Sequence, residues 1–176
     1  GFNDFILATG YKKEIIENLD DTDWNLDLLY DFAPMLGITT IVANYSRWVI
    51  DLNRDPENKS LYNDGRIITS LCPKTNFLGE NIYHSGKEPN KENIENRLLN
   101  YYWPYHNKID DLIHDFKTKF ETVFFWDAHS IRRYVPTINT HPFPDLIIGD
   151  NDGKTASSIF IKTCFDELKK SNLNLT

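Results

Sequence analysis

The order of apolar and polar positions along the chain predicts helices that alternate with short strands. Helical spacing of apolar residues runs over 11–19 and 20–37, and a longer helical pattern covers 91–120. A last amphipathic pattern spans 157–170. Pro104 falls inside the long pattern and is expected to kink the helix or split it in two, because proline lacks a backbone donor and clashes with the preceding turn.

Short runs of β-branched or aromatic residues predict the strands. Four segments have this character: 38–43, 47–52, 122–126 and 145–148. We expect 38–43 to be a buried strand because it is a β-branched run, and 122–126 to be a buried strand because of its mostly apolar composition. Strands of about five residues between longer helices indicate an α/β fold with a mixed, largely parallel sheet flanked by helices. No repeat or linker divides the chain, so we expect one domain over 1–176.

Composition and charge narrow the classes of function. The 176 residues are 40% apolar and 26% charged, which is typical of a globular protein. Acidic residues outnumber basic ones 26 to 19 and no basic run occurs, so a nucleic acid or an anionic membrane is not an expected partner. No apolar run is long enough to predict a membrane span. The two cysteines are expected to be reduced thiols of a cytoplasmic protein, and a single disulfide in an exported protein is the alternative.

Polar residues follow the predicted strands, where ligand sites of α/β sheets gather. His129 lies three residues after the end of 122–126 and could bind a metal, with Asp127 fixing its orientation; alternatively both side chains only satisfy loop backbone groups. Asp23 lies in the first turn of a predicted helix, where a carboxylate can reach a metal or simply stabilise the helix dipole.

A second group of candidate residues surrounds the segment 47–52. Arg47 is its first residue, and Asn53 and Arg54 follow it. A guanidinium offers a rigid fork of donors that matches a carboxylate, which favours binding of an acidic substrate. The alternative is that Arg54 pairs structurally with Asp51.

The order and spacing of these motifs resemble one known family. DTDWNLDLLYDFAPMLG, NYSRWVIDLNR, YHSGKEPNKENIENRLLNYYWPYH, VFFWDAHSI and FPDLIIGD follow one another between Asp21 and Asp150. This series is similar to the N-formylglutamate amidohydrolase family. The resemblance implies a zinc-dependent hydrolase with a zinc carboxypeptidase- and aspartoacylase-like fold, which cleaves N-formyl-L-glutamate to formate and L-glutamate in histidine degradation. Its partner is then a small anionic N-acyl amino acid.

The resemblance also implies roles for seven residues: Asp23 and His129 as ligands of Zn²⁺ or another divalent metal, Asn53 and Arg54 as the holders of a substrate carboxylate, Arg47 and Arg97 near the substrate, and Asp127 as an active-site carboxylate. The family's His-Ser-Gly motif would fall just before Gly1, and its N-x-P-Y-x-G-G segment and late glutamate would fall after Thr176. We therefore expect the chain to be incomplete at both ends. Two other functions stay open: hydrolysis of another N-acyl amino acid, and ligand binding without catalysis by a degenerate relative.

Overall fold

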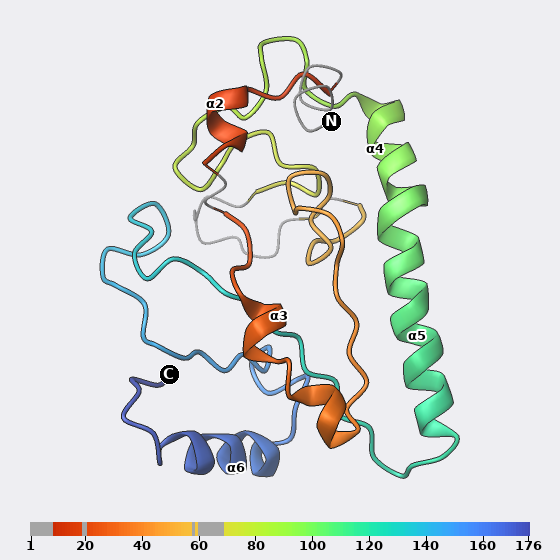
Figure 1. The fold of residues 1–176 in the computed structure, drawn as a ribbon, viewed down its shortest axis with the longest axis vertical. Coiled ribbons are helices and arrows are strands. Elements are labelled where there is room, and N and C mark those ends of the chain that lie inside the picture. Colours follow the sequence, from red (N-terminus) through yellow and green to blue (C-terminus); the bar gives the residue numbers. More distant parts are fainter. Residues whose placement is uncertain (1–8, 19–20, 58, 60–68) are drawn as a thin grey trace. The chain divides into compact units, whose positions relative to one another are not determined.

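The computed structural model describes residues 9–18, 21–57, 59 and 69–176 (Figure 1). The chain forms two compact units, Gly1–Ile131 and Arg132–Thr176. The expectation of a single domain over 1–176 stays a prediction.

Helices are the regular elements of both units. Those of the first unit are α2 (Lys13–Ile16), α3 (Leu26–Leu29), the 3-10 helix η1 (Ala33–Leu36), α4 (Lys91–Arg97), the π-helix η2 (Leu98–Tyr102) and α5 (Trp103–Lys117), and the second unit contributes α6 (Ser158–Leu168). Within the described residues, no helix combines the length and the apolar character that crossing a bilayer requires.

The two helices predicted near the N-terminus are shorter than expected. Only α2 forms within 11–19, of which Leu19 lies outside the described residues, as does Asp20 of the next predicted helix. The pattern 20–37 forms α3 and η1 only. Apolar side chains of this segment, such as Leu28 and Met35, are exposed. Short helices depend on packing of their apolar face, so these segments form single turns.

The long pattern 91–120 forms one continuous helical run, α4–η2–α5, rather than two helices (Figure 1). Asn90 and Asn93 exchange side-chain and backbone hydrogen bonds as a capping box at its start. Directly before Pro104, the N–H of Trp103 donates to the carbonyl of Leu98, five residues back. A π turn of this kind adjusts the hydrogen-bond ladder where proline supplies no donor, so the helix continues past Pro104.

The described residues form no sheet, and this corrects the strand predictions. Three isolated bridges are present: Tyr11 with Tyr83, Thr75 with Asn81, and Leu146 with Leu175. Of the predicted strands, only 145–148 has such a bridge, and it runs parallel to 174–176. The segment 122–126 has no regular secondary structure and is not buried, since Phe124 is 69% and Phe125 54% exposed. The strands were predicted from residue composition, but a strand also needs a neighbouring strand that accepts and donates its backbone hydrogen bonds.

Two buried clusters hold the first unit together around the segment 46–54. One contains Tyr11, Ile16, Trp48, Ile82 and Tyr83, and the other contains Ile50, Leu71, Cys72 and Tyr102. The Tyr11 hydroxyl donates to the carbonyl of Trp48 at 2.7 Å. Because Trp48 and Ile50 belong to different clusters, both sides of 46–54 are anchored, and this fixes the polar residues that lie along it.

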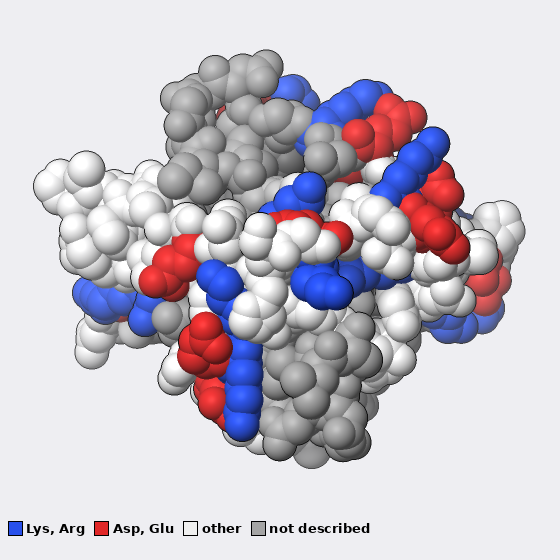
Figure 2. All heavy atoms as spheres, turned by 90° about the horizontal axis from the view of Figure 1, so that it is seen from above, with Lys and Arg blue, Asp and Glu red and all other residues white. Residues whose placement is uncertain are grey.

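Charged side chains of both signs lie beside one another on the surface. Figure 2 shows Lys and Arg next to Asp and Glu on the visible face. Some charged side chains form ion pairs with residues four positions apart in the sequence, among them Lys13 with Glu17 and Lys162 with Asp166. Such exposed pairs contribute little stability. Each of them places a negative charge beside a lysine.

Candidate functional site

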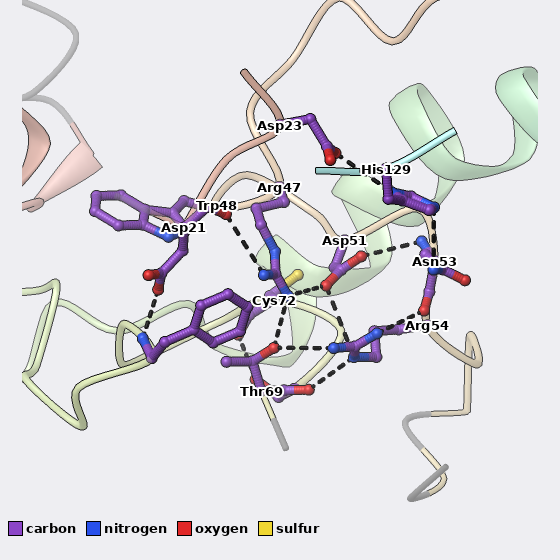
Figure 3. A network of polar contacts seen from close by, with 12 residues as sticks. Asp21, Asp23, Arg47, Trp48, Asp51, Asn53, Arg54, Thr69, Cys72 and His129 are labelled. Carbon is purple, nitrogen blue, oxygen red and sulfur yellow. Dashed lines mark hydrogen bonds and ion pairs between the residues drawn. The ribbon is translucent and has the colours of Figure 1, made fainter. Parts of the chain in front are cut away.

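Three segments far apart in the sequence meet at the imidazole of His129. Its Nδ1 lies 3.3 Å from Asp23 Oδ2, and its Nε2 lies 3.0 Å from Asp127 Oδ2. The side-chain nitrogen of Asn53 is 3.2 Å from the same Nε2. Figure 3 shows Asp23 and Asn53 directed at His129 from different segments. The imidazole is 46% exposed, so a small molecule can reach it. The structure thus brings together four of the seven predicted site residues.

Reciprocal hydrogen bonds align the two segments that carry Asp23 and His129. The N–H of Ser130 donates to Asp23 Oδ1, and the N–H of Trp24 donates to Ser130 Oγ at 2.7 Å. Each segment therefore donates to the other through adjacent residues. This pairing uses Oδ1 of Asp23 and leaves Oδ2 of the same carboxylate directed at the imidazole.

The two carboxylates around His129 change how it titrates. Hydrogen bonds to Asp127 and then to Asp23 raise the pKa of His129 to about 10, against the effect of burial. Burial on its own would raise the pKa of Asp23, but the hydrogen bonds from His129 and from the Ser130 N–H lower it overall. When no metal ion is bound, this raised pKa makes the imidazole a cation at neutral pH, and it lies between two carboxylates.

Arg47 belongs to a buried polar network next to this group. Its guanidinium forms an ion pair with Asp51 and donates to the Thr69 hydroxyl at 2.8 Å. It also lies 4.6 Å from the centre of the Phe77 ring, within range of a cation–π contact. The buried carboxylate of Asp21 accepts from the Phe77 N–H. These contacts hold the segment that precedes Asn53.

Arg54 is bound to the same network from the other side. Its Nε donates to the Thr69 carbonyl at 3.1 Å and its Nη1 to the Asn53 carbonyl at 2.8 Å. Nε also lies 3.7 Å from Asp51 Oδ2, so the pairing of Arg54 with Asp51 that the sequence left open is present. The Asn53 N–H donates to Asp51 Oδ1 at 3.0 Å. Asp51 therefore organises the turn that presents Asn53 to His129 (Figure 3).

Arg97 has different neighbours. It extends from the end of α4, and its Nη1 donates to the Val49 carbonyl at 2.7 Å and approaches the Tyr83 hydroxyl at 3.2 Å. Burial and the Arg97 cation act in opposite senses on Tyr83, and burial prevails, so the pKa of that phenol is raised. Among the residues that the structure describes, Arg97 contacts Val49 and Tyr83 and none of the residues that touch His129.

Comparison with known proteins decides the family. The sequence profile described as N-formylglutamate amidohydrolase matches residues 6–176. The chain belongs to this family. Two curated relatives are N-formylglutamate deformylases: that of Pseudomonas aeruginosa is 42% identical over 135 residues, which are 77% of this chain and 50% of the relative, and that of Pseudomonas putida is 36% identical over 156 residues, 87% of this chain and 58% of the relative. The chain thus spans about half the length of the curated relatives it matches.

A solved structure supports the shared fold. The crystal structure of the N-formylglutamate amidohydrolase from Ralstonia eutropha JMP134 superposes with a TM-score of 0.68 at 22% identity and covers 86% of this chain and 58% of its own. The family resemblance that the motifs indicated is confirmed. This N-formylglutamate amidohydrolase family member therefore shares its fold with that protein over the matched part.

The described residues of this family member supply part of a metal site. Asp23 and His129 are an oxygen and a nitrogen donor, the kinds of ligand that zinc takes. Among the residues that the structure describes, however, no group of three or more His, Cys, Asp or Glu side chains is arranged to hold a metal ion. The carboxylates contact the two ring nitrogens instead of facing a common point. The Asp23–His129 pair fits a metal site only if another ligand joins it.

Two residues of the site were missed by the sequence analysis. Ser130 aligns Asp23 with His129, and its place beside His129 was a usable signal, because a backbone N–H next to a metal-ligand candidate often fixes a carboxylate. Thr69 joins both arginines through its carbonyl and hydroxyl, but no pattern around it in the sequence singled it out.

Proposed function

We propose that the protein hydrolyses the amide bond of a small N-acyl amino acid, with N-formyl-L-glutamate as the first candidate, to give formate and L-glutamate. The observation that carries this proposal is the convergence of Asp23, Asn53 and Asp127 on His129 in a member of this family. The names of the two Pseudomonas relatives support the choice of substrate. The cellular setting that follows is histidine degradation in the cytoplasm, and the two free cysteines agree with a reducing compartment.

The metal centre is part of the same proposal. We expect Asp23 and His129 to contribute two ligands to a divalent cation, zinc in the first place, with a further ligand from residues outside those described. When bound, such a metal polarises the acyl carbonyl and lowers the pKa of a water molecule. The α/β class with a central sheet is likewise proposed for the whole protein.

The residues around His129 have separate tasks in this proposal. Asn53 is exposed and its amide is a donor next to the imidazole, so it can hold a carboxylate of the substrate. Arg54 supports it by binding the Asn53 carbonyl and by adding positive charge behind it. Asp127 contacts His129 Nε2 and can orient the imidazole and accept a proton as the amide is cleaved. Arg47 forms an ion pair with Asp51, which in turn holds the turn that carries Asn53.

A substrate panel tests this proposal. The intact protein, loaded with zinc, is assayed for release of free amino acid from N-formyl-L-glutamate, N-formyl-L-aspartate and N-acetyl-L-glutamate, with chelator-treated protein as the control. We expect the highest kcat/KM for N-formyl-L-glutamate and loss of activity with the chelator. Preference for another substrate would assign the protein to a related amidohydrolase. Binding of N-formyl-L-glutamate without turnover of any substrate would instead identify a non-catalytic binding domain.

A further inference from the structure

A second feature of the first unit is a cavity of about 330 Å³ beside the long helix. The segment 41–45 forms one wall, and Tyr101, Tyr105 and Lys108 on the helical run form the opposite wall. Ile50 and Leu52 also line it. Its volume lies at the lower end of the range of about 300–1,000 Å³ typical of ligand pockets, so its occupant is a small molecule or part of one.

The cavity adjoins the residues around His129. Leu52, which lines the cavity, directly precedes Asn53, whose side chain touches the imidazole. On the helix side, burial and the negative charge of Asp127 raise the pKa of Tyr105, so that phenol lies within the electrostatic field of the candidate site. A molecule held at Asn53 can therefore extend into the cavity.

The lining of the cavity combines apolar surface with one cation. Ile50, Leu52 and the rings of Tyr101 and Tyr105 offer surface for a short aliphatic chain. Lys108 is exposed, and within the described part of the chain no carboxylate pairs with it. In a protein of formal net charge −7, a lysine that lines a partly apolar cavity and has no carboxylate partner among the described residues favours an anionic group at that point.

We propose that this cavity binds the side chain of the amino-acid substrate, and that Lys108 pairs with a carboxylate at the end of that side chain. The inference rests on the proposed function, because it assumes that the substrate is an N-acyl amino acid held at Asn53. It adds a specificity-determining residue: acidic amino acids are selected over their neutral amides. The class of ligand is an amino acid with a short aliphatic stem and a terminal carboxylate.

Binding measurements test this inference separately from turnover. Calorimetric titration compares L-glutamate with L-glutamine, which differ in side-chain charge but hardly in shape, on the intact wild-type protein and on Lys108→Met. We expect the wild type to prefer L-glutamate and Lys108→Met to lose about 10- to 100-fold in affinity for it, with little change for L-glutamine. Lys108→Arg should retain most of the preference. Lys117→Met is the matched control, since Lys117 is exposed on the same helix and does not line the cavity.

The results of these titrations can contradict the role of Lys108 without contradicting the proposed hydrolysis, and the reverse. Equal affinity of the wild type for both ligands, absence of binding, or an unchanged preference in Lys108→Met would overturn the role of Lys108 even if N-formyl-L-glutamate is hydrolysed. A charge preference that depends on Lys108, in a protein that hydrolyses none of the N-acyl substrates, would support the inference and contradict the proposed function.

Discussion

His129 is contacted through both ring nitrogens, and this arrangement determines how it titrates. In chelator-treated protein, we expect its pKa to lie near 10, well above the ordinary value of 6.5, because Asp127 and Asp23 stabilise the imidazolium. Since the folded-state pKa is raised, the stabilisation is complete below about pH 6.5 and is lost as the pH rises through 10. NMR titration of the imidazole and urea unfolding at several pH values measure both effects.

Substitutions of the two carboxylates test the cause of that shift. Asp127→Asn should lower the pKa of His129 the most and Asp23→Asn by a smaller amount, in the order of their contributions. Asp27→Asn, in α3, is the control and should leave it unchanged. An unchanged His129 titration in both Asp127→Asn and Asp23→Asn would show that these contacts are absent in solution.

Substitution of Arg54 tests how Asn53 is held in the site. Arg54→Lys keeps the positive charge, but one ammonium group cannot replace a fork that binds both the Thr69 and Asn53 carbonyls. With Asn53 less well held, we expect kcat/KM for N-formyl-L-glutamate to fall by about 10- to 1,000-fold. Steady-state kinetics measure this, with circular dichroism to check folding. Arg133→Lys, an exposed arginine paired with Asp145, should behave as the wild type. Equal kinetics of Arg54→Lys and the wild type would remove Arg54 from the site.

The long helix is the element whose sequence signals were most complete. Its apolar spacing predicted the run, and Asn90 caps its first turn. Asn90→Ala removes the acceptor for the Asn93 N–H and should lower the free energy of unfolding by about 0.5–2 kcal/mol. Asn96→Ala, inside α4, is the matched control, since alanine favours helix interiors and no cap is lost. Urea unfolding of both variants measures the difference; equal midpoints would show that the capping box contributes nothing.

Helices were easier to predict from the sequence than strands, and the reason is physical. A helix satisfies its backbone hydrogen bonds within one segment, so the spacing of apolar residues in 91–120 and in 157–170 was sufficient evidence for α4–η2–α5 and for α6. A strand needs a second segment in register. The composition of 122–126 therefore predicted a buried strand wrongly, because composition could not show whether a neighbour pairs with the segment. The effect of Pro104 could not be predicted from the local sequence either. A kink or a break of the helix was expected there, but a π turn lets the helix continue.

At the scale of the whole molecule, the sequence located the site better than it located the contacts within it. The DTDW, DLNR and DAHS motifs marked Asp23, Asn53 and His129, which the structure brings together. The partners of Arg97 at Val49 and Tyr83 could not be predicted, because they depend on where α4 packs. The family profile matches residues 6–176, a range that contains all of these site residues.

The central claim is that His129 is the centre of an amide-hydrolysing site, and formate release from N-formyl-L-glutamate tests it most directly. The intact zinc-loaded protein is compared with His129→Ala and with His141→Ala, a histidine in the second unit whose recorded contacts lie within its own loop. Changes to residues that merely support a metal ligand cost about 10- to 100-fold, so we predict a loss of at least about 100-fold in His129→Ala and none in His141→Ala. Equal rates of formate release by His129→Ala and the wild type would contradict the account.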